Sequence, residues 1–221
     1  MTPAVQVFRD DSLSVPVCGW LHRPEQTSDR GLVLTHGAGS NSKTSLLISL
    51  ADSFAGACVS VLRCDLPFRQ NRSFGPPRPG DAERDREGLR NAVTAMRKLG
   101  CAQIFLGGHS YGGRQATMLC AEERDLVAGL LLLSYPLHPP RKPTQLRVKH
   151  LPELHMPALF VHGTRDPFGS VEEMESVLKL IPAKTQLLTV DGAGHDLGFK
   201  GKSVRDGLAG EVAAAFAGFL R

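Results

Sequence analysis

The sequence has no long apolar run, few aromatic residues and no strong excess of one charge. No stretch of its 221 residues approaches the roughly 18 consecutive apolar residues that a membrane-spanning helix needs. Residues 1–13 lack the basic segment and apolar run of a secretory signal. The formal net charge is only +4, and the basic residues are scattered, which argues against nucleic acid as a partner. We therefore expect a soluble, cytoplasmic protein that binds neither membranes nor nucleic acids.

Metal-binding and disulfide patterns are also absent from the sequence. The five cysteines are an odd number without CxxC spacing, which favours free thiols in a reducing compartment. His150 and His155 are interrupted by Pro152, so they lack the helical spacing of a metal site. We expect no catalytic metal and no cofactor.

The residues that are present alternate between short apolar runs and amphipathic segments. The length and the 42% hydrophobic content suit one domain spanning residues 1–221. The pattern predicts strands at 31–36, 57–64, 102–107, 128–134, 158–162 and 185–190, and helices at 44–55, 81–99, 113–123, 171–180 and 204–220. Residues 4–9 and 13–22 read as a strand pair at one edge, and 68–80 and 136–157 as irregular loops.

This alternation predicts an α/β fold with a mostly parallel central sheet and helices on both faces. In such sheets, ligands bind beyond the carboxyl ends of the strands. The loop at 136–157 is too short for a separate cap domain, which favours a shallow pocket and a small substrate.

A glycine-flanked serine follows one of these strands. Residues 108–112 read Gly-His-Ser-Tyr-Gly, between an apolar run and a helix-forming segment. Glycines in G-x-S-x-G allow a sharp strand-to-helix turn that exposes the serine with strained backbone. Ser110 is therefore a candidate nucleophile.

An acid and a base follow Ser110 in the chain, each just after a predicted strand. Asp166 lies in His-Gly-Thr-Arg-Asp-Pro, and His195 lies in Gly-Ala-Gly-His. A serine hydroxyl needs a base to remove its proton, and the base needs an orienting acid. The order serine, aspartate, histidine, with each residue at a carboxyl edge, predicts a catalytic triad.

Acyl transfer also needs backbone donors for the negative charge that develops on the carbonyl oxygen. The amide of Tyr111, directly after the nucleophile, is one candidate. The turn at residues 36–39 follows the first apolar run, and its Ala38 amide is the second. We expect His36 in this turn to shape the loop and not to act as a base.

The chain resembles the α/β-hydrolase superfamily from Gly31 to the C-terminus, through LTHGAGS, GGHSYGGRQA, SYPLHPPRKPTQLRVKHL, HGTRDPFG and GAGHDL. Within it, the sequence is similar to a small, lid-poor group of predicted hydrolases related to dienelactone hydrolases, in which Lys and Met more often flank the serine. The resemblance implies a serine hydrolase that cleaves a small ester, thioester or lactone through an acyl-enzyme on Ser110. It leaves open the oligomeric state, the identity of this small-molecule carbonyl substrate, and whether water or, in a transferase, another group accepts the acyl group.

Two other functions fit parts of the sequence. A eukaryotic relative of the group belongs to a chromatin-modifying complex, so the scaffold alternatively serves as a non-catalytic interaction module. Residues 37–44 also resemble the phosphate loop of nucleotide hydrolases, with Asp65 as a magnesium ligand. Ser42 replaces the second glycine of that motif, and the hypothesis leaves Ser110, Asp166 and His195 without a role.

Arginines are frequent in the loops at the predicted active edge. Arg69, Arg72, Arg141 and Arg165 are candidates for binding an anionic group of the substrate. The alternative for these residues is a solvated surface with ion pairs to acidic neighbours such as Asp65, Asp81 and Glu153. Arg114, one turn into the helix after the nucleophile, is expected to be a packing and ion-pair residue.

Overall fold

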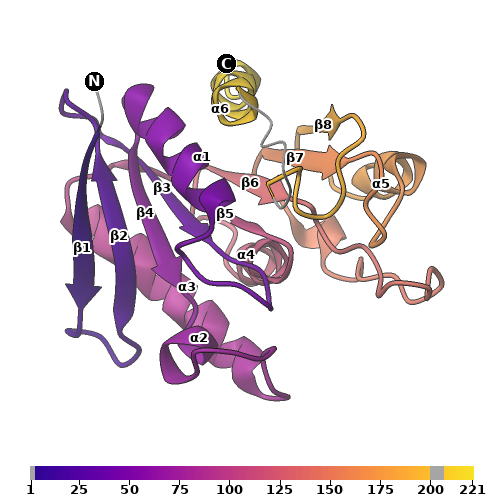
Figure 1. The fold of residues 1–221 in the computed structure, drawn as a ribbon, viewed down its shortest axis with the longest axis horizontal. Coiled ribbons are helices and arrows are strands. Elements are labelled where there is room, and N and C mark those ends of the chain that lie inside the picture. The colour runs from indigo at the N-terminus through magenta and orange to yellow at the C-terminus, as the bar shows by residue number, and fades with distance from the viewer. Residues whose placement is uncertain (1–2, 200–206) are drawn as a thin grey trace.

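In the described part of the chain, eight strands form one sheet in the order β1-β2-β4-β3-β5-β6-β7-β8 (Figure 1). The computed structural model describes residues 3–199 and 207–221. The strands are β1 (Ala4–Asp10), β2 (Val17–Arg23), β3 (Arg30–Thr35), β4 (Ser60–Asp65), β5 (Gln103–His109), β6 (Gly129–Leu133), β7 (Ala158–Gly163) and β8 (Thr185–Val190). From β4 to β8 all neighbours are parallel, whereas β2 runs antiparallel to both β1 and β4. The predicted parallel sheet with an antiparallel strand pair at one edge is confirmed.

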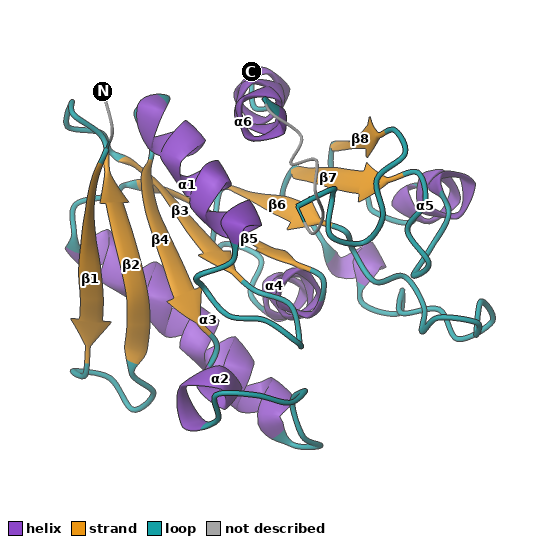
Figure 2. Cartoon of the chain, in the orientation of Figure 1, coloured by secondary structure: helices purple, strands orange, loops and turns teal. Residues whose placement is uncertain are grey.

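Helices cover both faces of this sheet (Figure 2). They are α1 (Ser45–Gly56), α2 (Pro67–Asn71), α3 (Asp81–Lys98), α4 (Tyr111–Glu122), α5 (Val171–Leu178) and α6 (Leu208–Phe219). Buried residues of α1 and α6 pack with one face, and buried residues of α3, α4 and α5 pack with the other. Strand β6 is buried at every position because it is covered on both faces, as its apolar run predicts.

The structure differs from the sequence expectation mainly at element ends and in one loop. Helix α2 lies inside the segment expected to be irregular. Pro67 occupies its first position, where the missing N–H has no helical partner to lose, and the Leu66 carbonyl accepts from the Arg69 and Gln70 amides. Strand β2 begins four residues later than expected. The start expected for the last helix, residues 204–206, lies outside the described residues.

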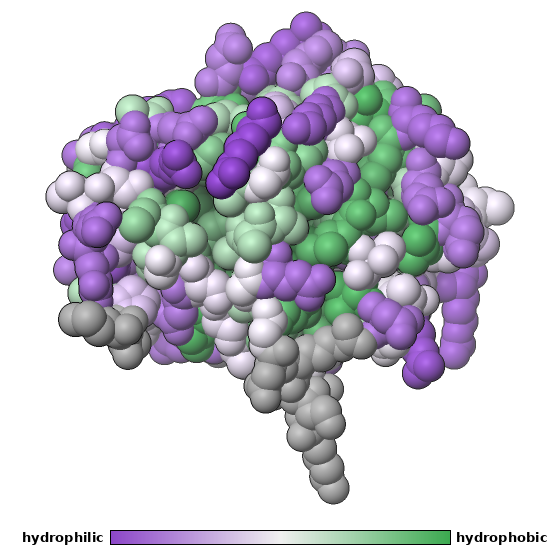
Figure 3. All heavy atoms as spheres, turned by 90° about the horizontal axis from the view of Figure 1, so that it is seen from above, coloured by the Kyte–Doolittle hydropathy of each residue, from purple (hydrophilic) through white to green (hydrophobic). Residues whose placement is uncertain are grey.

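A hollow lined mainly by apolar side chains lies at one end of the sheet. Between α1 and α6, at the amino ends of β3 and β5, a hollow of about 260 Å³ is lined mainly by apolar side chains such as Phe54, Phe105 and Phe216. In Figure 3, which views the molecule from above Figure 1, apolar residues gather around the middle of the face and hydrophilic residues lie mostly toward its rim. Within residues 3–199 and 207–221, none of the helices has the length and apolar character to cross a membrane.

Candidate active site

Ser110 occupies the sharp turn between β5 and α4. Its backbone has φ 52° and ψ −115°, a left-handed conformation that costs free energy in a residue with a Cβ atom. The turn is tight against the neighbouring loop, because a Cβ added at Gly112 would lie 2.6 Å from the His36 carbonyl oxygen. The strained turn holds the serine side chain at the carboxyl edge of the sheet, on the wall of a cavity of about 450 Å³.

The structure brings Ser110, His195 and Asp166 into one hydrogen-bonded chain. The Ser110 hydroxyl lies 2.8 Å from Nε2 of His195. On the other side of the ring, Nδ1 of His195 lies 2.8 and 3.0 Å from the two carboxylate oxygens of Asp166. A neutral imidazole that donates from Nδ1 to the carboxylate keeps its Nε2 lone pair for the serine proton.

The aspartate and the histidine are each held by further contacts. The Asp166 side chain is fully buried, and its Oδ1 accepts the Phe168 amide over 2.9 Å. The Phe168 ring lies against the His195 imidazole, with centroids 4.1 Å apart and planes 31° apart. Nε2 of His109 donates to the His195 carbonyl over 2.7 Å. His109 and Phe168 therefore hold His195 in place, a role for which their sequence context gives no signal beyond proximity to the motifs.

Ala38 and Tyr111, the expected oxyanion donors, both border the cavity beside Ser110. Within the described part of the chain, neither backbone amide donates to a protein acceptor. The Tyr111 side chain points away to α3, where its hydroxyl donates to the buried Asp85 carboxylate over 2.8 Å. Burial raises the pKa of Asp85, and burial together with that carboxylate raises the pKa of the Tyr111 phenol. This bond anchors Tyr111, which borders the cavity.

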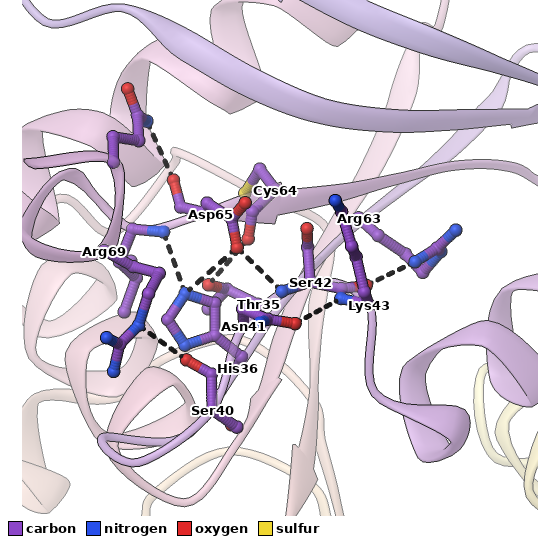
Figure 4. Close-up of polar contacts among 12 residues, drawn as sticks. Thr35, His36, Ser40, Asn41, Ser42, Lys43, Arg63, Cys64, Asp65 and Arg69 are labelled. Carbon is purple, nitrogen blue, oxygen red and sulfur yellow. Dashed lines mark hydrogen bonds and ion pairs between the residues drawn. The ribbon is translucent and has the colours of Figure 1, made fainter. Parts of the chain in front are cut away.

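Arg69 holds the loop that contains Ala38. Its guanidinium donates to four backbone carbonyls, those of Ala38, Ser40, Arg72 and Gly75, over 2.8–3.0 Å. Figure 4 shows this side chain beside Ser40. The residue is buried, with 7% of its surface exposed. Its donors are directed to the protein itself, so Arg69 fixes the loop that contains Ala38.

Polar contacts also fix the far end of this loop (Figure 4). The Ser42 amide donates to the Asp65 carboxylate over 2.7 Å, and Arg63 donates to the Ser42 carbonyl. In a phosphate loop, that amide and that carboxylate would face the nucleotide and its magnesium ion. Here they bind each other, and the geometry gives no support to the nucleotide hypothesis for residues 37–44.

His36 shapes the start of the loop. Its Nδ1 donates to the Gly37 carbonyl over 2.8 Å, and its Nε2 accepts the Leu66 amide over 3.1 Å. Burial lowers the pKa of this imidazole, which is fully enclosed and stacked at a tilt against Phe68. Both ring nitrogens of His36 are hydrogen-bonded to the backbone, so this residue shapes the loop, as expected from the sequence.

A family model described as an alpha/beta hydrolase domain matches residues 28–219. The chain belongs to the α/β-hydrolase family. Its fold is similar to that of several solved structures. Est1E from Butyrivibrio proteoclasticus has 17% identity and a TM-score of 0.75, with 97% of this chain and 98% of that chain covered. A dienelactone hydrolase from Anabaena variabilis has 18% identity and a TM-score of 0.73, with coverage of 99% and 97%. An alpha-beta serine hydrolase homologue from Coxiella burnetii has 14% identity and a TM-score of 0.71, with coverage of 98% and 96%.

The arginines of this α/β-hydrolase lie differently from what the sequence suggests. None of the four candidates Arg69, Arg72, Arg141 and Arg165 is among the described residues that line the Ser110 cavity. Arg69 binds backbone carbonyls, Arg72 forms a 2.9 Å ion pair with Asp81, and Arg141 and Arg165 are exposed.

The cavity is bordered instead by two other arginines, Arg114 and Arg147. Within the described part of the chain Arg114 has no ion pair, contrary to expectation. Its spacing of four residues from Ser110 is a signal that could have placed it at the site. The sequence around Arg147 has no such signal, because Arg147 reaches the cavity only through the folding of the loop that contains it.

Proposed function

We propose that this α/β-hydrolase is a serine hydrolase that cleaves a small ester, thioester or lactone through an acyl-enzyme on Ser110. The observation that carries the proposal is the unbroken hydrogen-bonded chain from the Ser110 hydroxyl through His195 to the buried Asp166. The free amides of Ala38 and Tyr111 beside that hydroxyl support it, because acyl transfer needs donors where the oxyanion forms.

In this mechanism His195 removes the Ser110 proton while Oγ attacks the substrate carbonyl carbon. The carbonyl oxygen becomes an oxyanion that accepts hydrogen bonds from the Ala38 and Tyr111 amides, each worth about 3 kcal/mol of the barrier. The imidazolium, stabilised by Asp166, returns the proton to the leaving alcohol or thiol as the carbon–heteroatom bond breaks. Water, deprotonated by His195, then hydrolyses the acyl-serine and restores the free hydroxyl.

The size of the cavity supports a small substrate. Its volume of about 450 Å³ lies in the lower part of the range for small-molecule sites. The segment between β6 and β7 contains only the short 3₁₀ turn Leu151–Glu153, so no cap domain encloses a long acyl chain. We expect faster hydrolysis of acetyl and butyryl esters than of long-chain esters.

Intact-mass labelling with a fluorophosphonate tests the activated nucleophile. We expect one adduct on the wild-type chain, located on Ser110 by peptide mapping. Ser110→Ala removes the adduct, and His195→Ala slows labelling by at least about 100-fold because the base is lost.

His155→Ala is the matched control, since this histidine is exposed and lies away from the Ser110 cavity. It leaves the labelling rate unchanged. Circular dichroism checks that each variant is folded. The proposal is contradicted if the folded wild-type chain takes no adduct, or if the His195→Ala variant is labelled as fast as wild type. Either result favours a scaffold without catalysis.

A further inference from the structure

Arg114 borders the cavity one helical turn after the nucleophile. Its backbone amide donates to the Ser110 carbonyl over 3.0 Å, which is the spacing of the first turn of α4. Residue 114 therefore lies in the first turn of α4, and its side chain lines the same cavity as Ser110. The side chain is half-buried, and its Nε is buried without a hydrogen-bond partner. The guanidinium therefore brings an uncompensated charge close to the reacting serine.

Arg147 reaches the same cavity from the loop between β6 and β7. Its backbone amide donates to Leu137 over 2.8 Å, and its carbonyl accepts the buried Tyr135 hydroxyl over 2.8 Å. One guanidinium nitrogen, Nη1, donates to the Pro136 carbonyl over 3.2 Å. These bonds fix residue 147 at the cavity wall, and they leave most of its guanidinium donors unused.

None of the described residues on the cavity wall carries a negative charge that would neutralise these two cations. The described lining residues include no aspartate or glutamate. Burial and then the charge of Arg114 lower the pKa of Arg147, and the same two causes lower the pKa of His150 to about 4. His150 is therefore neutral at pH 7 and is hydrogen-bonded to Thr117 over 2.8 Å. Two half-buried like charges without a counter-ion are costly, and a bound anion would offset that cost.

We infer that Arg114 and Arg147 form a subsite for a carboxylate that the substrate carries a few bonds from the carbonyl carbon attacked by Ser110. The inference rests on the proposed function and narrows it to carboxylate-bearing esters, thioesters or lactones. Planar guanidinium groups bind a carboxylate through paired N–H donors, which gives both affinity and orientation. The cavity volume and the single helical turn between Ser110 and Arg114 favour a short spacer between the two groups.

Two esters of similar length test this preference in the wild-type enzyme. Monoethyl glutarate carries a terminal carboxylate, whereas ethyl pentanoate ends in a methyl group. Released ethanol is measured for both, and we expect kcat/KM to be at least about 10-fold higher for the half ester. A neutral ester hydrolysed as fast as the half ester, or faster, overturns the inference.

Single variants then assign the preference to the two arginines. Arg114→Met and Arg147→Met lower the ratio of kcat/KM for monoethyl glutarate to kcat/KM for ethyl pentanoate by about 10-fold or more. Arg147→Lys keeps the charge without the planar fork and gives an intermediate value. Lys149→Met is the matched control, because Lys149 is exposed, two residues from Arg147 and outside the cavity lining. Equal losses for both esters, or the same loss in Lys149→Met, contradict the subsite.

A binding measurement separates failure of the subsite from failure of the proposed hydrolysis. In Ser110→Ala protein, which cannot form the acyl-enzyme, calorimetry measures the affinity for glutarate and for inorganic phosphate. Glutarate binding that Arg114→Met or Arg147→Met abolishes supports the subsite even if the wild-type enzyme cleaves neither ester. Absence of glutarate binding, or binding of phosphate alone, overturns the carboxylate assignment.

Discussion

Arg69 binds the loop that borders the Ser110 cavity, whereas Arg114 borders the cavity itself, and their guanidinium groups have different surroundings. Beside the loop that contains Ala38, Arg69 is buried and donates to four backbone carbonyls. On the cavity wall, Arg114 is half-buried, has an unpaired Nε and forms no ion pair within residues 3–199 and 207–221. Arg147 resembles Arg114, because its guanidinium has one bond to a carbonyl and no ion pair with a carboxylate of the described residues.

Whether its guanidinium donors are already bonded to the protein separates an arginine that stabilises the site from one that is available to a ligand. A guanidinium whose donors are all directed at the protein stabilises a loop conformation, and its removal leaves buried carbonyls without donors. A guanidinium with unused donors in a cavity contributes little to folding and is free to bind an anion. The two groups should therefore respond to the same substitution with effects of different size and sign.

The largest effect is expected for Arg69→Met. The methionine keeps part of the apolar stem, but four carbonyls around the loop lose a charged donor. We expect the free energy of unfolding to fall by about 3 kcal/mol. The fluorophosphonate labelling rate of the folded fraction should fall by about 10-fold, since the Ala38 amide is no longer held. Urea denaturation and labelling kinetics measure the two effects.

Arg72→Met is the control for this comparison. Arg72 lies three residues away and pairs with Asp81, but both side chains are partly exposed, 25% and 30%. A surface pair of this kind is worth about 1 kcal/mol or less. If Arg72→Met lowers the free energy of unfolding and the labelling rate as much as Arg69→Met, the effect of Arg69→Met does not come from the bonds between Arg69 and the loop.

Tyr111→Phe should have a smaller effect on the same side of the site. The change leaves the residue 111 amide in place but removes the hydroxyl that donates to the buried Asp85 carboxylate. An unsatisfied buried acceptor costs about 1–3 kcal/mol, so we expect a loss of stability of that size. Labelling of Ser110 should stay within about fivefold of the wild-type rate. A loss of labelling without a loss of stability would mean that the hydroxyl acts in the reaction itself.

The pH dependence of the free energy of unfolding should show that the buried Asp85 carboxyl destabilises the fold when it is ionised. Burial raises the pKa of this carboxyl in the folded state, so the folded chain binds its proton more tightly than the unfolded chain. Its contribution to stability is complete below the usual Asp pKa and is lost as the pH rises through the folded pKa. In Asp85→Asn, the amide can still accept the Phe68 amide and donate to Tyr111. The stability of this variant relative to wild type should increase from pH 3 to pH 7 in urea titrations. A difference that is independent of pH would contradict the raised pKa.

The sequence was sufficient to predict the sheet, its antiparallel edge and the residues at the carboxyl ends of the strands. Apolar runs and glycine turns are local signals, and the parallel topology follows from their alternation. Ser110, Asp166 and His195 could be found because each follows such a run directly. The sequence could not show in this way which arginines bind the protein backbone and which border the cavity. Arg69 lies in a short helix that the loop composition obscured, and two of its four acceptors, the Ala38 and Ser40 carbonyls, lie about thirty residues earlier in the chain.

The smallest effect on stability is expected for Arg147→Met, and its sign should be opposite to that of Arg69→Met. Removing this charge relieves the repulsion from Arg114 and loses only one long hydrogen bond to Pro136. We expect the free energy of unfolding to change by about 0.5 kcal/mol or less at low salt, in the direction of greater stability, because like-charge pairs of this kind are mildly destabilising. Thermal unfolding at 20 mM and 500 mM salt measures this, because salt screens the repulsion and should remove the gain. A binding site that is costly to the free protein fits this result, since groups arranged for a ligand are commonly unfavourable for folding. A clear loss of stability in Arg147→Met would instead place Arg147 with Arg69, as a residue that builds the site.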